Sequence, residues 1–467
     1  MTRTLTIEGI APGGEGFGRD GERAVFVPFT APGDEVEAEV PPGSGPAHAT
    51  LVRVLREGAE RVEPPCVHFG VGEALRGIGD TLVRPSAPVG REASGEAPIA
   101  PAGFASPDRC GGCQWLHLRY EAQLAAKERA FFETLRRIAK LDPGDARRPI
   151  LPSPQPLRYR ARAKFHFDRP SGRLVFFRRR SHEPVRLFEC HLLLSPLDAL
   201  REAVGPAIAR ARLDVREVIL EWSDHEGRGA AHLRLAALTP SARDRAAALL
   251  AAVPTLAGLV LEAEGSAPVL VGDPMLRQAR VPDDPTAGVQ RSRPDVFQQA
   301  NRGANAVLVE TAVRLLAADG ANVLELFCGA GNFTAAIAAR SRMVHAVEVQ
   351  GPALDLARAD LSGGNVRFFA GDALQLARAF ARDRSAPRFD AVLLDPPREG
   401  ARGIGPALRD LGASRAVYVS CDPATLARDV RGCVEAGYRV THVQPVDMFP
   451  QTHHVEAVVL MERRSTA

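Results

Sequence analysis

The stretch NVLELFCGAGNF, residues 322–333, decides the fold of this chain. It predicts a buried strand, then a turn that contains Gly329 and Gly331, then the start of a helix. Glycine permits such a tight turn and lets a ligand approach the backbone closely. In doubly wound sheets, ligands bind just beyond the carboxyl ends of the strands. A lone Gly-x-Gly also suits any nucleotide site or a plain tight turn, so its meaning depends on the neighbouring strands.

The residues that follow repeat the same strand–helix unit. Strands are expected at MVHAVEV, VRFFAG, FDAVLLD and AVYVSC, each followed by a helix, and a helix over 302–318 precedes the first strand. Such alternation predicts a parallel sheet covered by helices on both faces. We therefore expect an α/β doubly wound, Rossmann-like domain over residues 291–467.

Acidic residues stand at successive strand ends of this domain. Glu325 lies just before the glycine turn, Glu348 ends the second strand, and Asp372 ends the third. Glu348 is placed to accept hydrogen bonds from ribose hydroxyls, and Asp372 to sit beside an adenine. A dinucleotide site would have a third glycine where this chain has Thr334, so the set favours S-adenosylmethionine. The alternative is that these acids are helix N-caps.

A cysteine and a glutamate near the C-terminus are candidates for covalent chemistry. VYVSCDPATLARD (417–429) places Cys421 between a strand and a helix. The positive end of a helix lowers the pKa of a nearby thiol and so favours the nucleophilic thiolate. Glu456 begins an apolar strand, where a carboxylate is unfavourable unless it is used or paired. Cys328 in the glycine turn and Cys433 in a helix are expected to be packing residues.

Four motifs together resemble the RNA 5-methyluridine methyltransferase family, in the same order and spacing. They are LELFCGAGNF, LLDPPREGA (393–401), VYVSCDPATLARD and FPQTHHVE (449–456). The resemblance implies that Cys421 adds to uridine C6, that Glu456 removes the C5 proton, and that Asp395 and Arg398 help to hold the target base. It also implies cofactor contacts from Gln299 in FQQAN and from Phe327, Gly329, Gly331, Asn332, Glu348, Asp372 and Asp395.

The sequence before residue 291 predicts folds that differ from the α/β domain. Residues 1–57 read as short strands punctuated by Gly and Pro, the pattern of a small antiparallel β-barrel, and the resemblance identifies it as TRAM-like, with an OB-like fold. Residues 58–290 are expected to form a central α+β domain. Within it, residues 73–107 are rich in Gly, Pro and Ala, and we expect an insertion that loops away from the cysteine site.

Four of the seven cysteines lie in this N-terminal half. An odd count in a chain that we expect to be cytosolic argues against a disulfide framework. The C-x-x-C of Cys110 and Cys113 alone is compatible with zinc, redox chemistry or no site. The residues flanking Cys66, Cys110, Cys113 and Cys190 resemble the iron–sulfur site found in part of the family. The resemblance therefore implies a [4Fe–4S] cluster, with zinc as the next alternative.

The expected partner is RNA, although the net charge of +3 is weak evidence for it. The best patch is Arg178, Arg179 and Arg180 with the arginine face of 158–164; the alternative is a solvated hairpin face. By resemblance, 23S ribosomal RNA is preferred to transfer RNA. Rival functions are an RNA cytosine-5 or amino-group methyltransferase and an RNA-binding folding factor with a vestigial site. Without an apolar run of membrane-spanning length, we expect a cytoplasmic protein, and no obligate protein partner is evident.

Overall fold

The computed structural model describes residues 1–70, 110–282, 284–361 and 364–464. The expected insertion at 73–107 lies outside these described residues. The chain divides into two compact units. Unit 1 comprises residues 1–126, 168–191 and 451–453, and unit 2 comprises 127–167, 192–450 and 454–467. The expected central domain, 58–290, is therefore divided between the two units.

Unit 1 contains a six-stranded sheet with the order β5-β3-β2-β1-β4-β6. All its pairings are antiparallel except the one between β3 and β5. Alternate residues such as Leu5 and Ile7, or Val25 and Val27, are buried, which is the pattern of a sheet with one apolar face. The strands are β1 (Thr2–Ile10), β2 (Gly16–Asp20), β3 (Arg23–Val27), β4 (Glu35–Glu39), β5 (Ala47–His48) and β6 (Thr50–Arg56). The short strands β8 (Arg173–Phe177) and β9 (Pro184–Val185) also belong to this unit.

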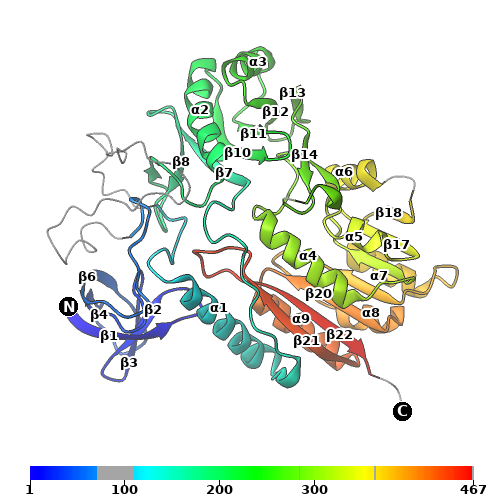
Figure 1. Ribbon diagram of the computed structural model, residues 1–467, viewed down its shortest axis with the longest axis horizontal. Coiled ribbons are helices and arrows are strands. Elements are labelled where there is room, and N and C mark those ends of the chain that lie inside the picture. Colours follow the sequence, from blue (N-terminus) through cyan, green and yellow to red (C-terminus); the bar gives the residue numbers. More distant parts are fainter. Residues whose placement is uncertain (71–109, 283, 362–363, 465–467) are drawn as a thin grey trace. The chain divides into compact units, whose positions relative to one another are not determined.

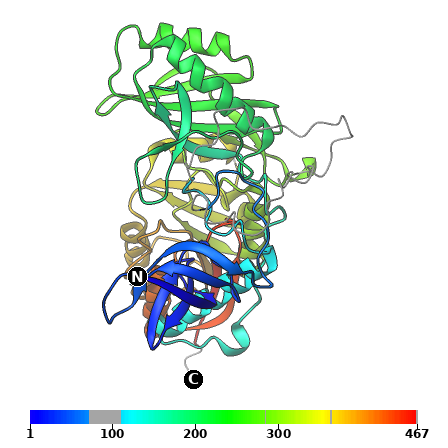
Figure 2. The same ribbon diagram turned by 90° about the vertical axis from the view of Figure 1, so that its left-hand side faces the viewer.

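The unit 2 strands of the next sheet run in the order β13-β12-β11-β10-β7. Helices α2 and α3 pack against each other and against its strands, so they cover the same face (Figures 1 and 2). The elements are β7 (Arg162–Asp168), α2 (Ser195–Ala211), β10 (Val215–Ser223), β11 (Arg228–Leu235), α3 (Ala242–Ala252), β12 (Leu256–Glu262) and β13 (Val269–Gly272). The hairpin of β14 (Leu276–Ala279) and β15 (Val289–Ser292) leads to the second sheet.

The second sheet of unit 2 has the order β18-β17-β16-β19-β20-β22-β21. Its first five strands are parallel, and β22 is antiparallel to both of its neighbours. Its elements are α4 (Arg302–Leu316), β16 (Asn322–Leu326), α5 (Thr334–Ala338), β17 (Met343–Glu348), α6 (Gly351–Leu361), β18 (Val366–Ala370), α7 (Ala373–Arg382), β19 (Ala391–Leu394), α8 (Ile404–Leu411), β20 (Arg415–Ser420), α9 (Pro423–Glu435), β21 (Tyr438–Val446) and β22 (Glu456–Arg463). The expected alternation of strands and helices is therefore present.

Side chains of this sheet alternate between two apolar cores, one on each face. Leu324 and Leu394 pack with residues of α7, α8 and α9, whereas Val323 and Leu393 pack with residues of α4, α5 and α6. This division follows from the two-residue period of a strand. Cys328 lies in the α4 core and Cys433 in the other, so their expected packing roles are confirmed. Within the described ranges, no helix is long and apolar enough to cross a membrane.

A fully buried ion pair fixes the loop that precedes β22. Lys127 lies in helix α1 (Tyr120–Thr134), which continues into a π-helical turn at Leu135–Ala139. Its ammonium group lies 2.5 Å from Oδ1 of Asp447 and donates to the Phe449 carbonyl at 2.9 Å. Both side chains are fully buried. Each charge depends on the other, because burying an unpaired ion is strongly unfavourable.

We expect Lys127→Met to lower the free energy of unfolding by about 3–5 kcal/mol, because it removes one partner of a fully buried ion pair. Urea denaturation followed by circular dichroism measures the change. Lys164, whose pair with Glu217 is partly exposed, provides the matched control, and Lys164→Met should change stability by less than about 1 kcal/mol. Equal effects of the two substitutions would contradict the structural importance of the buried pair.

Candidate active site

Four reactive side chains lie at the ends of four neighbouring strands, in the spatial order β16, β19, β20 and β22. Glu325 is in β16, Asp395 follows β19, Cys421 follows β20, and Glu456 begins β22. Leu326 pairs with Leu394, Leu394 with Tyr418, and Ser420 with Ala457. In this register Cys421 is level with Glu456, two residues beyond Asp395 and four beyond Glu325. Side chains an even number of residues apart in a strand point to the same face of the sheet. The α4 core contains Val323, Leu393, Val417 and Val458. By this period, the α4 side of the sheet also carries Glu325, Asp395, Cys421 and Glu456.

The two acids and the thiol at this edge are all held towards their neutral forms. The pKa of Glu456 is raised to about 8, mainly by burial and also by Asp395, with Arg398 opposing the rise. Burial also raises the pKa of Asp395 to about 7. Glu456 is 4% exposed, whereas Asp395 is half-buried. These side chains are close enough to influence one another electrostatically.

The expected lowering of the Cys421 pKa is wrong for the ligand-free protein. The pKa of this thiol is raised to about 11, mainly by burial and also by Glu456 and Asp395, with Arg398 opposing the rise. The positive end of α9 is also occupied already, because Asp422 is its N-cap and accepts from the backbone N–H groups of Ala424 and Thr425. Desolvation and two acidic neighbours therefore outweigh the helix, and the thiol needs a base to lose its proton.

The glycine turn after β16 has the backbone that a close ligand requires. Phe327, Gly329 and Gly331 have φ values of 63°, 54° and 86°, which lie in the left-handed region that glycine adopts most readily. A Cβ added at Gly329 would meet nothing within 4 Å, so there is room beside the turn. Glu348 accepts from the Gly329 N–H at 2.9 Å and from two further N–H groups after β17. Its carboxylate therefore ties two strand ends together.

The structure also places the other expected cofactor residues. Asp372 is the N-cap of α7 and accepts from the Gln375 N–H at 2.8 Å. Asn332 exchanges two amide hydrogen bonds with Asn305 of α4. Gln299 is partly buried. Sequence reasoning missed Asn305, and it also missed Gln290, which donates to the Ala330 carbonyl in the turn.

A buried aspartate that sequence reasoning missed, Asp429, holds the DPPREGA loop. It accepts hydrogen bonds from the Ala401 N–H at 2.7 Å and the Tyr418 hydroxyl at 2.8 Å. Gly400 has a φ of 72°, and a Cβ there would lie 2.4 Å from Asp429 Oδ2. Only glycine fits this position without displacing the aspartate. The loop thereby carries Asp395 and the exposed Arg398 on a fixed support from α9.

In unit 1, three cysteine-bearing segments are joined through His68. Its carbonyl accepts from the Cys110 N–H at 2.9 Å, and its Nε2 accepts from the Phe188 N–H at 2.9 Å. The pKa of Cys66 is raised to about 12, mainly by burial, and nearby Cys110 and Cys190 contribute to the rise. All seven cysteines are described, and none forms a disulfide. Among the described residues, no three ligand-type side chains stand in a metal-binding arrangement.

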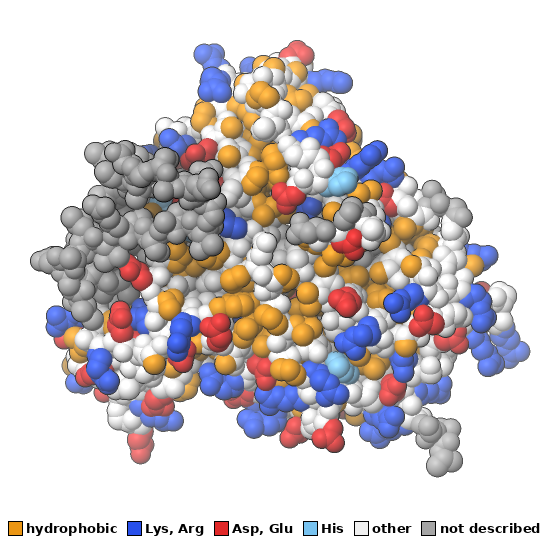
Figure 3. Space-filling model, in the orientation of Figure 1, with side chains coloured by type: hydrophobic (Ala, Val, Ile, Leu, Met, Phe, Trp, Pro, Cys, Tyr) orange, Lys and Arg blue, Asp and Glu red, His pale blue; other side chains and the backbone are white. Residues whose placement is uncertain are grey.

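The expected arginine patches carry less free charge than the sequence suggests. In unit 2, Arg162 pairs with Glu221 and Lys164 with Glu217. In unit 1, Arg179 and Arg180 both pair with Glu15 and Arg178 pairs with Glu183. On the face shown in Figure 3, basic and acidic side chains are interspersed over unit 2. Acidic partners therefore offset part of the positive charge of both segments.

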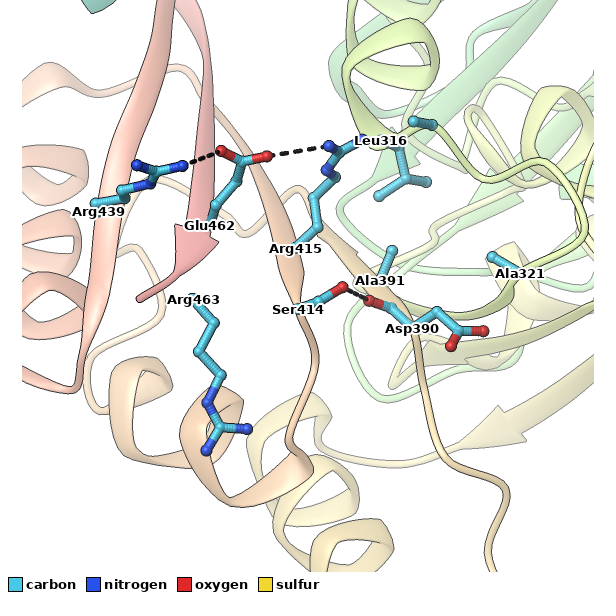
Figure 4. Close-up of a pocket in the computed structure, with 10 residues that line it drawn as sticks. Leu316, Ala321, Asp390, Ala391, Ser414, Arg415, Arg439, Glu462 and Arg463 are labelled. Carbon is cyan, nitrogen blue, oxygen red and sulfur yellow. Dashed lines mark hydrogen bonds and ion pairs between the residues drawn. The ribbon is translucent and has the colours of Figure 1, made fainter. Parts of the chain in front are cut away.

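A polar hollow of about 340 Å³ lies at the opposite ends of the same strands (Figure 4). Arg415 begins β20, Arg439 is near the start of β21, and Glu462 is near the end of β22. Glu462 accepts from Arg415 at 3.0 Å and from Arg439 at 3.4 Å. This hollow contains none of the four reactive side chains, and we do not regard it as the catalytic site.

The chain is similar along nearly its whole length to curated enzymes. It is 34% identical to the 23S rRNA (uracil(1939)-C(5))-methyltransferase RlmD of Pseudomonas entomophila, over 98% of this chain and 93% of the relative. It is 33% identical to the enzyme of the same name from Alkalilimnicola ehrlichii, over 99% and 96% of the two chains. The chain belongs to the RNA (uracil-C5)-methyltransferase family. Residues 277–464 match the tRNA (uracil-5-)-methyltransferase family model, and residues 1–41 match the TRAM domain.

A solved structure supports the fold of this RNA (uracil-C5)-methyltransferase. The tRNA (uracil-54, C5)-methyltransferase of Pyrococcus abyssi, in complex with S-adenosyl-L-homocysteine, matches with a TM-score of 0.69 and 21% identity. The match covers 98% of this chain and 100% of that one. At this identity the likeness concerns the fold, and it agrees with the expected TRAM-like N-terminal part and methyltransferase domain.

Proposed function

We propose that this enzyme transfers a methyl group from S-adenosylmethionine to C5 of a uridine in 23S ribosomal RNA. The observation that carries the proposal is the meeting of Cys421, Glu456 and Asp395 at the strand edge that also bears the glycine turn. The named relatives that match over nearly the full chain act on 23S rRNA, which favours this substrate over transfer RNA. Cysteine and glutamate in this arrangement also favour C5 methylation over amino-group methylation, which needs no thiol.

The chemistry follows from what each side chain can do. A carboxylate at the site first takes the proton of the Cys421 thiol. The thiolate sulfur then forms a bond to uridine C6, and the base becomes an enolate whose C5 is nucleophilic. The cofactor supplies the methyl group that C5 accepts. Glu456 then removes the C5 proton, the C5–C6 double bond re-forms, and the sulfur–C6 bond breaks to release Cys421. The released thiolate regains the proton that the first carboxylate took, Glu456 gives the C5 proton to solvent, and one methyl group remains on the base.

Asp395 and Arg398 act on the target base through the DPPREGA loop. Arg398 is exposed at the site and offers hydrogen-bond donors to uracil oxygens, while Asp395 can bond the N3–H. C6 is inaccessible inside a base stack, so the target uridine must be unstacked or turned out of its helix. The buried hydrogen bonds of Asp429 preorganise this loop before RNA arrives.

The residues of the glycine turn suit S-adenosylmethionine. Phe327, Gly329 and Gly331 set a turn that leaves space for a ligand, and Glu348 and Asp372 present oxygens at adjacent strand ends. Glu348 retains acceptor capacity for ribose hydroxyls, since each carboxylate oxygen can accept more than one hydrogen bond. Gln299, Asn332 and Asp395 complete the proposed binding set.

Glu456→Gln should form the covalent adduct and transfer the methyl group but release product at least about a hundredfold more slowly, because general-base catalysis is worth about 10²–10⁴ in rate. Intact-protein mass spectrometry of the reaction with substrate RNA would show methylated RNA attached to the enzyme. Glu462→Gln, at the far end of the same strand, is the matched control and should turn over normally. Wild-type turnover by Glu456→Gln would exclude the assigned base.

We further propose that Cys66, Cys110, Cys113 and Cys190 bind a [4Fe–4S] cluster. Four thiols are a suitable donor set for iron–sulfur ligation, and His68 links the segments that carry Cys66, Cys110 and Cys190 in one region of unit 1. The electrostatic influence of Cys110 and Cys190 on Cys66 supports a common site for these sulfur atoms. Ligation would draw them together, as metal binding is coupled to folding.

Protein purified without oxygen should contain about four iron and four sulfide per chain and absorb broadly in the visible range. Elemental analysis and absorption spectroscopy provide the measurement. Cys110→Ser should lose the iron, while Cys433→Ser, which changes a core cysteine of unit 2, should retain it. Stoichiometric zinc without iron or sulfide would refute the cluster.

A further inference from the structure

The segment 447–455 joins β21 to β22 and leads directly to Glu456, but it has no regular secondary structure. At its start, three successive backbone carbonyls each accept a hydrogen bond from a side chain. The pairs are Asn301 Nδ2 with Met448 at 3.0 Å, Lys127 Nζ with Phe449 at 2.9 Å, and the Tyr159 hydroxyl with Pro450 at 3.0 Å. We refer to Asn301, Lys127 and Tyr159 as the carbonyl clamp.

The three side chains of the carbonyl clamp come from separate parts of unit 2. Lys127 lies in α1, Tyr159 precedes β7, and Asn301 is the N-cap of α4. All three residues are at most 4% exposed. A buried carbonyl must find a hydrogen-bond donor, and a segment outside a strand ladder has no neighbouring strand to supply one. The clamp therefore supplies side-chain donors at the point where the ladder of β21 ends.

Glu456 occupies the last pair of the β21–β22 ladder, next to this segment. Its partner in β21 is Val446, the residue that precedes the segment. On the other side of β22, the pairing with β20 starts only at Ala457. The end of a ladder opens more easily than its middle, because fewer backbone bonds hold it. The position of the Glu456 carboxyl group therefore depends on how firmly the residues after Val446 are held.

We propose that Asn301 and Tyr159 are positioning residues for Glu456. This inference rests on the proposed function, in which Glu456 removes the C5 proton. By holding the carbonyls of Met448 and Pro450, the two side chains keep the end of the ladder closed and the carboxyl group in line with C5. Such support matters because a displacement of about 1 Å can slow a reaction step about a hundredfold.

The effect of the clamp is confined to the release of product. Thiol addition and methyl transfer depend on Cys421 and on the loop that carries Asp395. The strand before Cys421, β20, lies between β19 and β22, and Asp429 holds the loop. Glu456 acts only after methyl transfer. Loss of a clamp hydrogen bond should therefore leave a methylated covalent intermediate that resolves slowly.

Tyr159 provides the cleanest test among the three donors. Lys127 also neutralises the buried Asp447, so its replacement affects folding. Asn301 caps α4 and lies two residues after Gln299, a proposed cofactor contact. Replacing Tyr159 by phenylalanine removes only the hydroxyl group and keeps the ring.

Single-turnover reactions of the full chain with substrate RNA and labelled S-adenosylmethionine test the proposal. Label in total RNA measures methyl transfer, and intact-protein mass spectrometry measures the methylated RNA still attached to the enzyme. Tyr159→Phe should transfer the methyl group within about twofold of the wild-type rate but release the RNA about tenfold more slowly. Tyr438→Phe is the matched control, because this buried hydroxyl also donates to backbone carbonyls, at 3.0 and 2.7 Å, but at the other end of β21. It should leave both rates unchanged.

Release at the wild-type rate by Tyr159→Phe, or equal slowing of both steps, would overturn the proposal. If that variant does not fold, Asn301→Ser tests it, because serine still caps α4 but is too short to reach the Met448 carbonyl. This variant should also accumulate the methylated adduct. Wild-type enzyme that makes no C5-methylated uridine would refute the proposed function itself. Normal wild-type product with unchanged release by the variants would refute only the role of the clamp.

Discussion

The register of β16, β19, β20 and β22 is the constraint on which the site depends. Backbone pairing brings the ends of β16, β19 and β20 and the start of β22 to one edge, and the two-residue period turns Glu325, Asp395, Cys421 and Glu456 to one face. A shift of one residue in any of these strands would send its reactive side chain into the opposite apolar core. The residues come from distant parts of the sequence, so only the sheet brings them together.

The same burial that assembles these groups keeps them neutral until ligands arrive. Removing carboxyl and thiol groups from water disfavours their charged forms, and the groups also repel one another when ionised. Their charge states are therefore set by the whole site and by what binds there. The supports are buried as well, since Asp429 fixes the substrate loop and the Lys127–Asp447 pair fixes the approach to Glu456.

Much of the C-terminal domain could be predicted from the sequence because its signals are local. Buried strands, the glycine turn and the strand-end acids follow one another in short motifs, and the structure has these elements in this order. Charge states and partners could not be predicted, because they depend on residues distant in sequence. Cys421 illustrates this, since burial, Glu456 and Asp395 reverse the effect expected from the helix. Arg179 and Arg180 likewise pair with Glu15, which is distant in sequence. The residues around Lys127 in the sequence also give no sign that Asp447 is its buried partner.

The central claim is that Cys421 forms a covalent bond to C6 of the target uridine. The most direct measurement uses substrate RNA that carries 5-fluorouridine, because fluorine cannot be removed from C5 as a proton can. Peptide mass spectrometry after nuclease digestion should find the methylated fluorouridine attached to the peptide containing Cys421, and Cys421→Ala should form no adduct. An adduct on another residue, or one that persists in Cys421→Ala, would contradict the account.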